Sequence, residues 1–281
     1  MQVIDQQLVS QVIQLTRQAS EAILSVYHDE DRFAVTLKSD QSPVTAADIA
    51  AHQVLQAGLQ SLLANVPVLS EEADIPCFEE RQHWQRYWLV DPLDGTKEFI
   101  RRNGEFTVNV ALIEKGRPVL GVVTVPVTGE VYWGVSGLGA FKQGLTDSSG
   151  LPVKQMTVRK MAPRLEQGLP VEVLASRRHG DQAMAVLLSQ LHQQFTHIAC
   201  QAMGSSLKLC LLADARADLY PRLAPTSEWD TAAAQAIVEA AGGSVVDMNF
   251  LPLKYNTKAS LLNPHFYVIA DTDYPWQSLL S

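Results

Sequence analysis

The segment 88–96, with the sequence WLVDPLDGT, combines residue types that could bind a metal ion. An apolar run ends at Asp91 and Asp94 follows three residues later, so two carboxylates and the Leu93 carbonyl would lie at one edge. These are hard oxygen ligands of the kind that Mg²⁺ prefers. Gly95 lets the backbone approach a ligand closely, and the amides after it would begin a helix whose N-terminus attracts phosphate. The segment suits chemistry on a phosphate, although two aspartates in a tight turn could also serve only as a helix cap.

Other acidic residues stand at positions of the same kind. Glu71 and Glu72 follow the apolar run 66–69, and adjacent acids at a strand end are costly unless they are solvated or bound to a cation. Asp230 stands at the start of an alanine-rich helix, and Asp48 lies in the first turn of another. At such positions an aspartate often only caps the helix. Each of the four residues has an ordinary structural interpretation, but their joint occurrence favours one shared site.

The hydrophobic pattern predicts the elements that would position these acids. Apolar residues recur at helical spacing from Val3 to about His28, and a capping-box pattern predicts a second helix from Thr45. The apolar runs 66–69 and 87–90 predict buried strands that carry carboxylates at their C-terminal ends. Three β-branched runs between residues 106 and 135 predict an antiparallel meander.

The second half of the chain alternates strands and helices. We expect strands at 171–175 and 217–220, and helices at 181–195, 205–213 and 229–241. The turn-rich stretch 144–154 is the only patch long enough for a domain junction. It would divide a single unit into an N-terminal half, residues 1–150, with most of the acidic candidates and a C-terminal half, residues 151–281, with Asp230. Mixed strands and helices throughout favour a layered α/β sandwich over an all-α or all-β fold.

The composition limits the classes of protein to which the chain could belong. It has 281 residues, 47% of them hydrophobic and 19% charged, as in a globular protein with a large core. The formal charge of −8 argues against binding to nucleic acid. The sequence contains no stretch of 18 apolar residues, so we expect no membrane span. The first residues lack the basic region of a signal peptide. The three cysteines are widely separated, which fits a reducing compartment, so we expect a cytoplasmic protein.

The motifs together resemble those of the inositol monophosphatase superfamily, whose members depend on Mg²⁺ and are sensitive to lithium. The resemblance rests on the segment 91–96, on Glu71 upstream and on Trp229-Asp230 downstream, and it extends from the first helix nearly to the C-terminus. Within the superfamily the chain most resembles the 3′(2′),5′-bisphosphate nucleotidases. The stretches that carry this closer resemblance are 42–48, 68–72, 91–99, 204–208 and 219–222.

The resemblance implies a fold and an activity. The fold would be the layered α/β/α/β/α sandwich of the sugar phosphatases. The reaction would remove the 3′-phosphate of adenosine 3′,5′-bisphosphate to give AMP and phosphate, with 3′-phosphoadenylyl sulfate as a further substrate, and it would clear an inhibitory by-product of sulfate assimilation. Relatives are described as cytoplasmic or as peripheral on the cytoplasmic side of the inner membrane, and no basic amphipathic helix in the sequence indicates the second location.

Two other functions stay open at this point. An inositol or sugar monophosphatase of the same superfamily would use the same metal chemistry on another substrate. A metal-binding regulatory module that has lost catalysis would keep the acidic residues without needing a pair of residues to activate water. The oligomeric state is not indicated by the sequence.

The resemblance also implies roles for individual residues. The metal ligands would be the side chains of Glu71, Asp91, Asp94 and Asp230 and the carbonyl of Leu93. They would hold two Mg²⁺ ions bridged by Asp91, and Glu72 would assist through water at a third, more weakly held ion. Asp48 and Thr96 would orient and deprotonate the attacking water. Two such ions would clamp both the nucleophile and the leaving oxygen of an in-line displacement.

The substrate would reach beyond the metal ions. Its contacts would be Glu71, Leu93, Asp94, Gly95, Thr96, His179, Ser205, Lys208, Arg222 and Asp230, with the Gly95 and Thr96 amides on the phosphate. Lys208 and Arg222 would meet the second phosphate of a nucleotide bisphosphate, although each alone could be a solvated surface cation. His179 lies in the stretch SRRHG, where Arg178 departs from the small residue that the family usually has.

Overall fold

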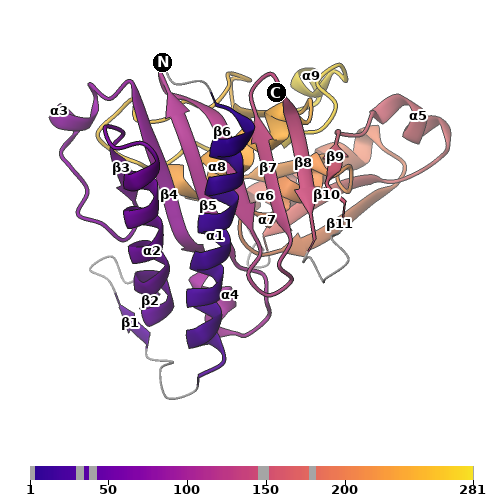
Figure 1. Ribbon diagram of the computed structural model, residues 1–281. Helices are drawn as coiled ribbons and strands as arrows, with labels where there is room; N and C mark the ends of the chain where they lie inside the picture. Colours follow the sequence, from indigo (N-terminus) through magenta and orange to yellow (C-terminus); the bar gives the residue numbers. More distant parts are fainter. Residues whose placement is uncertain (1–3, 30–34, 38–42, 145–151, 177–181, 281) are drawn as a thin grey trace.

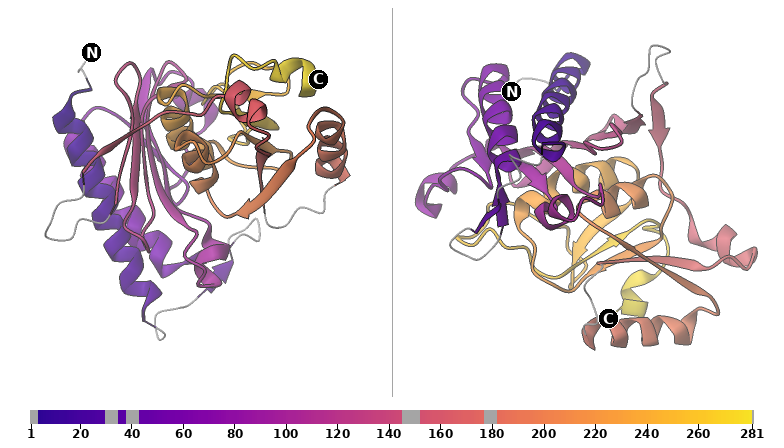
Figure 2. Two further views of the ribbon diagram at one scale, coloured as in Figure 1. Left: turned by 90° about the vertical axis from the view of Figure 1, so that its right-hand side faces the viewer. Right: turned by 90° about the horizontal axis from the view of Figure 1, so that it is seen from below.

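The layers of the fold explain how residues far apart in the sequence reach one site. The computed structural model describes residues 4–29, 35–37, 43–144, 152–176 and 182–280. Helices α1 (Gln6–Tyr27) and α2 (Ala46–Leu62) cover the outer face of a seven-stranded sheet (Figure 1). Helices α7 (Leu207–Ala213) and α8 (Glu228–Ala240) lie between this sheet and a five-stranded sheet (Figure 2, left). Helices α6 (Gln182–Gln194) and α9 (Trp276–Leu280) pack on the far face of the second sheet, which completes the predicted α/β/α/β/α sandwich.

The first sheet brings acidic residues to one edge. Its strands, in sheet order, are β3 (Val68–Ser70), β4 (Arg86–Asp94), β5 (Thr107–Glu114), β6 (Arg117–Thr124), β7 (Val131–Val135), β8 (Gly139–Gln143) and β9 (Lys154–Met156). Strands β3 and β4 are parallel, and every later neighbouring pair is antiparallel. Because parallel strands end at the same edge, Glu71 after β3 lies beside the end of β4, and its amide donates to the Val90 carbonyl at 3.1 Å. The register shifts between Asp91 and Asp94, so the strand bulges where the two aspartates lie.

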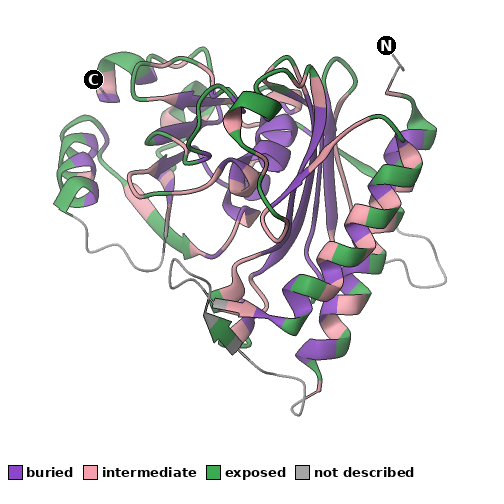
Figure 3. Ribbon diagram, turned by 90° about the vertical axis from the view of Figure 1, so that its left-hand side faces the viewer, coloured by how far each residue is buried: buried purple, intermediate pink, exposed green. Residues whose placement is uncertain are grey.

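The two outer helices begin at aspartate and threonine caps. Asp5 accepts a hydrogen bond from the Leu8 amide at 2.8 Å at the start of α1. Thr45 and Asp48 form the predicted capping box of α2. Both helices bury one stripe against the sheet and expose the other side (Figure 3), as amphipathic helices on a sheet do. The capping box fixes the position of Asp48 at the end of α2 that lies nearest the acidic edge.

Helix α8 lies unusually close to the first sheet because two strand residues are glycines. A Cβ atom built at Gly121 would be 2.0 Å from the Ala233 carbonyl oxygen, and one at Gly134 would be 2.6 Å from the Ile237 Cα. No side chain larger than hydrogen fits between these backbones. The close contact holds α8 against the sheet whose strand β4 carries Asp91 and Asp94, and the first turn of this helix carries Asp230.

The second sheet supplies the opposite wall of the site. Its strands, in sheet order, are β11 (Ile198–Met203), β10 (Val171–Ser176), β12 (Leu219–Arg222), β14 (Phe266–Ile269) and β13 (Ser244–Asp247). The loop after β11 leads into α7, and β12 ends at Arg222. The remaining elements are β1 (Val35–Leu37), β2 (Pro43–Thr45), α3 (Phe78–Arg81), α4 (Thr96–Ile100) and α5 (Met161–Glu166).

Most of the predicted elements are confirmed with shifts of one to three residues at their ends. The meander 106–135 is the antiparallel β5–β6–β7, and the helix predicted at 229–241 is α8. Ten of the described elements were not predicted, namely strands β1, β2, β8, β9, β11, β13 and β14 and helices α3, α5 and α9. Residues 145–151 of the expected junction lie outside the described residues, and α8 packs across both sheets, so the division at residue 150 stays a prediction. Within the described segments, no helix has the length and apolar character needed to cross a membrane.

Candidate active site

Three carboxylates converge where the two parallel strands meet the start of α8. Glu71, Asp91 and Asp230 each contribute one carboxylate oxygen, and these oxygens all lie within 4.8 Å of one another. Asp91 is buried, and the other two side chains are half-buried. Residues 71 and 230 are far apart in the chain, and the layered fold brings them together. A group of hard oxygen donors at this spacing matches the ligand chemistry of a divalent cation such as Mg²⁺.

The electrostatics of this cluster favour a bound cation. Burial, followed by the charges of Glu71, Asp94 and Asp230, holds the pKa of Asp91 well above its ordinary value. Burial and the neighbouring Asp94 raise the pKa of Asp230 in the same way. The pKa of Asp94 is also raised by burial, while the Lys208 ammonium opposes that shift. Like charges that share a buried site are unfavourable unless protons or cations balance them. The residues present therefore fit a metal ion.

Leu93 and Glu72 have different surroundings. The Leu93 side chain is buried, and its amide donates to an Asp91 carboxylate oxygen at 3.0 Å, which helps to fix the Asp91 side chain. Glu72 is half-buried and does not belong to the three-carboxylate group found among the described residues. The roles expected for the Leu93 carbonyl and for Glu72 stay predictions.

Asp48 and Thr96 lie together beside the acidic cluster. The Thr96 hydroxyl donates to Asp48 Oδ1 at 3.3 Å. Asp48 Oδ2 accepts from the Thr45 amide at 2.8 Å and from the Thr45 hydroxyl at 2.6 Å. The two oxygens thus have separate tasks, because one caps α2 and the other faces Thr96. Burial raises the pKa of Asp48, with a smaller contribution from the charge of Glu71.

Asp230 combines two tasks in the same way. Its Oδ2 accepts from the Ser227 amide at 2.9 Å as part of a capping box at the start of α8. The carboxylate nevertheless lies in the cluster with Glu71 and Asp91. The sequence left capping and metal binding open for this residue, and the structure accommodates both.

Gly95 forms the turn between the acidic edge and α4. Its φ is +97°, a left-handed conformation that glycine adopts without strain. A Cβ atom here would lie 3.3 Å from the Glu105 carbonyl oxygen, so the turn is also tightly packed. Helix α4 begins at Thr96, directly after this turn, as predicted.

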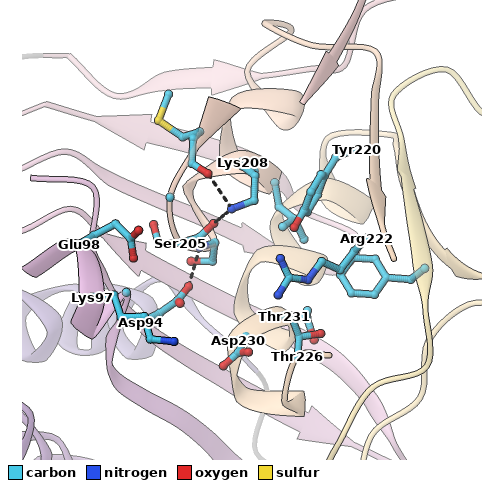
Figure 4. Close-up of a pocket in the computed structure, with 16 residues that line it drawn as sticks. Asp94, Lys97, Glu98, Ser205, Lys208, Tyr220, Arg222, Thr226, Asp230 and Thr231 are labelled. Atoms are coloured by element: carbon cyan, nitrogen blue, oxygen red, sulfur yellow. Dashed lines mark hydrogen bonds between the residues drawn. The ribbon is translucent and has the colours of Figure 1, made fainter. Parts of the chain in front are cut away.

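A cavity of about 220 Å³ extends from the acidic edge toward the second sheet. The expected site residues Asp94, Gly95, Ser205, Lys208, Arg222 and Asp230 line it, together with Lys97, Glu98, Met203, Gly204, Ser206, Leu209, Tyr220, Thr226, Thr231 and Phe266. Figure 4 shows Arg222 pointing into the space between Lys208 and Asp230. The cavity therefore has an acidic end and a basic wall.

The two basic side chains are held by backbone carbonyls. Lys208 Nζ donates to the carbonyl oxygens of Met203 at 3.2 Å and of Ser205 at 2.7 Å, and it lies 5.3 Å from the Tyr220 ring centroid (Figure 4). Arg222 Nε donates to the Ala224 carbonyl at 3.0 Å. These bonds to neutral carbonyls orient the two cationic side chains at the cavity, where charged donors can form charge-assisted hydrogen bonds to an anion.

The sequence identified only part of this cavity. Tyr220, Thr226 and Thr231 were not singled out, although Tyr220 stands in the stretch 219–222 that resembled the nucleotidases. Asn109 interrupts an otherwise apolar strand, which was a usable signal of a buried polar role. His179, and with it the contact expected there, lies outside the described residues.

Comparison with known families and proteins gives the same assignment. The model of the inositol monophosphatase family matches residues 5–273. This chain belongs to the inositol monophosphatase family. The 3′(2′),5′-bisphosphate nucleotidase CysQ of Escherichia coli strain K12 is 50% identical to it over 261 residues, which cover 93% of this chain and 99% of that protein. The enzyme of the same name from Haemophilus influenzae is 36% identical over 276 residues, with 98% of this chain and 97% of that protein covered.

Solved structures of related proteins superpose on this chain over nearly its whole length. CysQ from Bacteroides thetaiotaomicron, described as a bacterial member of the inositol monophosphatase family, superposes with a TM-score of 0.82 at 39% identity. The match covers 96% of this chain and 99% of that one. The SuhB protein of Bartonella henselae gives a TM-score of 0.75 at 21% identity over 98% of both chains, a likeness that concerns the fold alone. The family's layered sandwich is thus the fold of this chain.

Proposed function

We propose that this chain is a metal-dependent 3′(2′),5′-bisphosphate nucleotidase. It would hydrolyse the 3′-phosphate of adenosine 3′,5′-bisphosphate to AMP and phosphate, and would act on 3′-phosphoadenylyl sulfate as well. The relatives named 3′(2′),5′-bisphosphate nucleotidase, which match nearly the whole chain, support this assignment. The link to sulfate assimilation that the family resemblance implies is part of this proposal.

One observation carries the proposal. A single cavity joins an acidic end, where Asp94 and Asp230 lie, to a wall that bears Lys208 and Arg222. A nucleotide bisphosphate has two phosphates at opposite sides of a ribose, and the two ends of this cavity match them. One phosphate would lie beside cations held by the carboxylates, and the other would meet the basic side chains.

The metal ions in this proposal are two Mg²⁺, with a third held weakly near Glu72. The side chains of Glu71, Asp91, Asp94 and Asp230 and the Leu93 carbonyl would hold them. When bound, Mg²⁺ supplies Lewis-acid polarisation of the phosphate and makes water a better nucleophile. The charge of these ions would also let an acidic protein bind an anionic substrate.

The proton of the attacking water would pass to Asp48. Because the Thr96 hydroxyl donates its proton to Asp48 Oδ1, the Thr96 oxygen can accept a hydrogen bond from water. The water oxygen would form a bond to phosphorus while the bond from phosphorus to the 3′-oxygen breaks in line with it. The departing 3′-oxygen would take a proton from solvent water and become the 3′-hydroxyl of AMP. The proton moves through the Thr96 hydroxyl to Asp48, whose raised pKa makes it a stronger base than an exposed aspartate. The Gly95 and Thr96 amides would hold the phosphate oxygens.

The basic wall leads to a prediction about substrate choice. Lys208→Ala should raise KM for adenosine 3′,5′-bisphosphate by about tenfold or more, because a charge-assisted bond to the second phosphate is lost. The KM for inositol 1-phosphate or for 3′-AMP, which lack that phosphate, should change little. The measurement is steady-state phosphate release from these three substrates.

Lys258→Ala is the matched control for that experiment. Lys258 Nζ also donates to backbone carbonyls, those of Ser260 at 3.1 Å and Leu262, but it does not line the cavity. The control should leave the KM of all substrates unchanged. An equal rise in KM for mono- and bisphosphates in Lys208→Ala would instead favour the inositol or sugar monophosphatase.

The rates of the unmodified protein test the proposal itself. Phosphate release should be fastest from adenosine 3′,5′-bisphosphate when it is compared side by side with inositol phosphate and fructose 1,6-bisphosphate. A preference for either of the other two would contradict the nucleotidase assignment. The pairing of Thr96 with Asp48 argues against a non-catalytic module, since such a module has no use for a proton acceptor beside its metal site.

A cytoplasmic location is part of the proposal. It is supported by the cysteines, because Cys77, Cys200 and Cys210 all lie in the described part of the chain and all are free thiols. Unpaired thiols, two of them exposed, suit a reducing compartment.

A further inference from the structure

Strand β5 places two buried polar side chains directly behind the acidic edge. In the β4–β5 pairing, Asp91 lies opposite Asn109 and Asp94 lies opposite Thr107. Thr107 and Asn109 are two residues apart, so their side chains lie on the same face of the sheet. Both side chains are buried in a strand that is otherwise mainly apolar. Polar groups in such a place need hydrogen-bond partners.

Both side chains bond to one hydroxyl from the other half of the chain. The Ser206 hydroxyl donates to Asn109 Oδ1 at 2.9 Å and lies 2.8 Å from the Thr107 hydroxyl. Because Ser206 gives its only hydroxyl proton to Asn109, Thr107 must donate to Ser206. Ser206 is itself buried. We refer to Thr107, Asn109 and Ser206 together as the Ser206 lock.

The lock is attached to Asp94 at two points. The Ser206 amide donates to Asp94 Oδ2 at 2.5 Å, and the Asn109 side-chain amide lies 3.5 Å from the same oxygen. The residues that hold Ser206 in place therefore also fix the direction of the Asp94 carboxylate. Through Asp94, the lock reaches the acidic end of the cavity.

The lock is equally part of the basic wall. Ser206 lies between Ser205 and α7, the helix that carries Lys208. Ser205 has a φ of +47°, a left-handed conformation that is unfavourable for a serine unless the neighbouring contacts hold it. Its carbonyl accepts the bond from Lys208 Nζ (Figure 4). Ser206 thus anchors the loop from which both Ser205 and Lys208 face the cavity.

We infer that Ser206 is a positioning residue that joins the metal ligand Asp94 to the nucleotide-binding loop. This inference rests on the proposed function, in which Asp94 is a metal ligand and Ser205 and Lys208 contact the nucleotide. Because one buried hydroxyl orients both, its loss weakens the binding of metal and of nucleotide together. A residue that contacted only the nucleotide, such as Lys208, would weaken nucleotide binding alone.

A second buried hydroxyl pair provides a matched control. The Thr124 hydroxyl donates to the Thr16 hydroxyl at 2.7 Å, and both residues are buried between β6 and α1. Thr107→Val and Thr124→Val make the same chemical change, each in a strand of the same sheet. Both should therefore lower the melting temperature by similar amounts. Only Thr107→Val belongs to the Ser206 lock.

The experiment measures binding in the unmodified chain, Ser206→Ala, Thr107→Val and Thr124→Val. Isothermal titration with Mg²⁺ alone gives the metal affinity, and titration with AMP in saturating Mg²⁺ gives the nucleotide affinity. Ser206→Ala should weaken both by about tenfold, the effect typical of groups that orient a metal ligand. Thr107→Val should act in the same direction, while Thr124→Val should leave both affinities unchanged. The double variant Thr107→Val/Ser206→Ala should be no weaker than Ser206→Ala, because the two changes remove one shared bond.

The outcomes separate this inference from the proposed function. If Ser206→Ala and Thr107→Val lower the melting temperature as Thr124→Val does, yet bind Mg²⁺ with unchanged affinity, the lock is only structural and the inference is wrong. A loss of AMP binding with intact Mg²⁺ binding would likewise overturn the coupling to Asp94. If the unmodified chain releases no phosphate from nucleotide bisphosphates, the proposed function fails, while the Mg²⁺ affinities still decide the role of Ser206.

Discussion

The phosphatase activity of Asp91→Asn is expected to be about a thousandfold or more below that of the unmodified protein. Without Mg²⁺, however, the variant should melt at a higher temperature than the unmodified protein. Burial, followed by the charges of three neighbouring carboxylates, raises the pKa of Asp91. The same charge that would bind the metal is therefore unfavourable in the metal-free protein. Removing it should relieve the repulsion and abolish the metal site.

The pH dependence of the metal-free protein follows from the same shift. A carboxyl whose pKa is raised on folding binds its proton more tightly in the folded state than in the unfolded one. Folding stability without metal should therefore fall as the pH rises above the ordinary aspartate pKa of 3.8 and through the raised value. The fall should be smaller in Asp91→Asn. Added Mg²⁺ should raise the melting temperature of the unmodified protein at pH 7, because it binds only the folded state, and should not raise that of the variant.

Asp218→Asn is the control for a buried aspartate. Asp218 is fully buried too, but its carboxylate accepts from Arg159 at 2.6 and 2.7 Å. Its loss should lower the melting temperature with and without Mg²⁺, since the half-buried Arg159 loses its shortest ion pair, and activity should persist. The account of Asp91 is contradicted if Asp91→Asn stays active, or if it melts lower than the unmodified protein without metal and still responds to Mg²⁺.

For Asp48→Asn we expect kcat to fall by about 10²- to 10⁴-fold, the usual range for removal of a general base, while KM and the affinity for Mg²⁺ stay nearly unchanged. Asparagine can still accept the bond from the Thr45 amide, so the cap of α2 should survive. What is lost is the proton acceptor for the Thr96 hydroxyl. Steady-state kinetics together with Mg²⁺ titration distinguish these effects.

Asp5→Asn makes the same substitution at a helix cap away from the site. Asp5 caps α1 through the Leu8 amide and should affect stability only. If Asp48→Asn reduces kcat no more than this control does, Asp48 is a cap and the water-activating role assigned to it is wrong.

The sequence predicted the acidic edge well because the signals there are local. An apolar run followed at once by acids indicates a strand that ends in carboxylates, and β3 and β4 end in this way at Glu71 and Asp91. The sequence could not decide between a cap and a functional carboxylate at Asp48 and Asp230. The structure explains why, since at Asp48 each oxygen has its own partners, and at Asp230 the capping carboxylate also lies within the acidic cluster.

Contacts between distant segments could not be predicted. The bond from the Ser206 amide to Asp94 joins residues 112 positions apart, and it depends on how α7 packs between the two sheets. The close packing of α8 on the seven-stranded sheet depends on Gly121 and Gly134, which in the sequence look like ordinary glycines of a strand pattern. Strands β13 and β14 were missed because they are short and separated by a long irregular segment.

In the function proposed above, carboxylates from three distant segments hold divalent cations beside the phosphate to be removed. Diffraction from crystals of the unmodified protein grown with Mn²⁺ and AMP tests it most directly, because the anomalous signal locates each ion. The account predicts two strong peaks in contact with Glu71, Asp91, Asp94 and Asp230, with Asp91 touching both. If crystals grown with saturating Mn²⁺ show no anomalous peak at these four side chains, the proposal is contradicted.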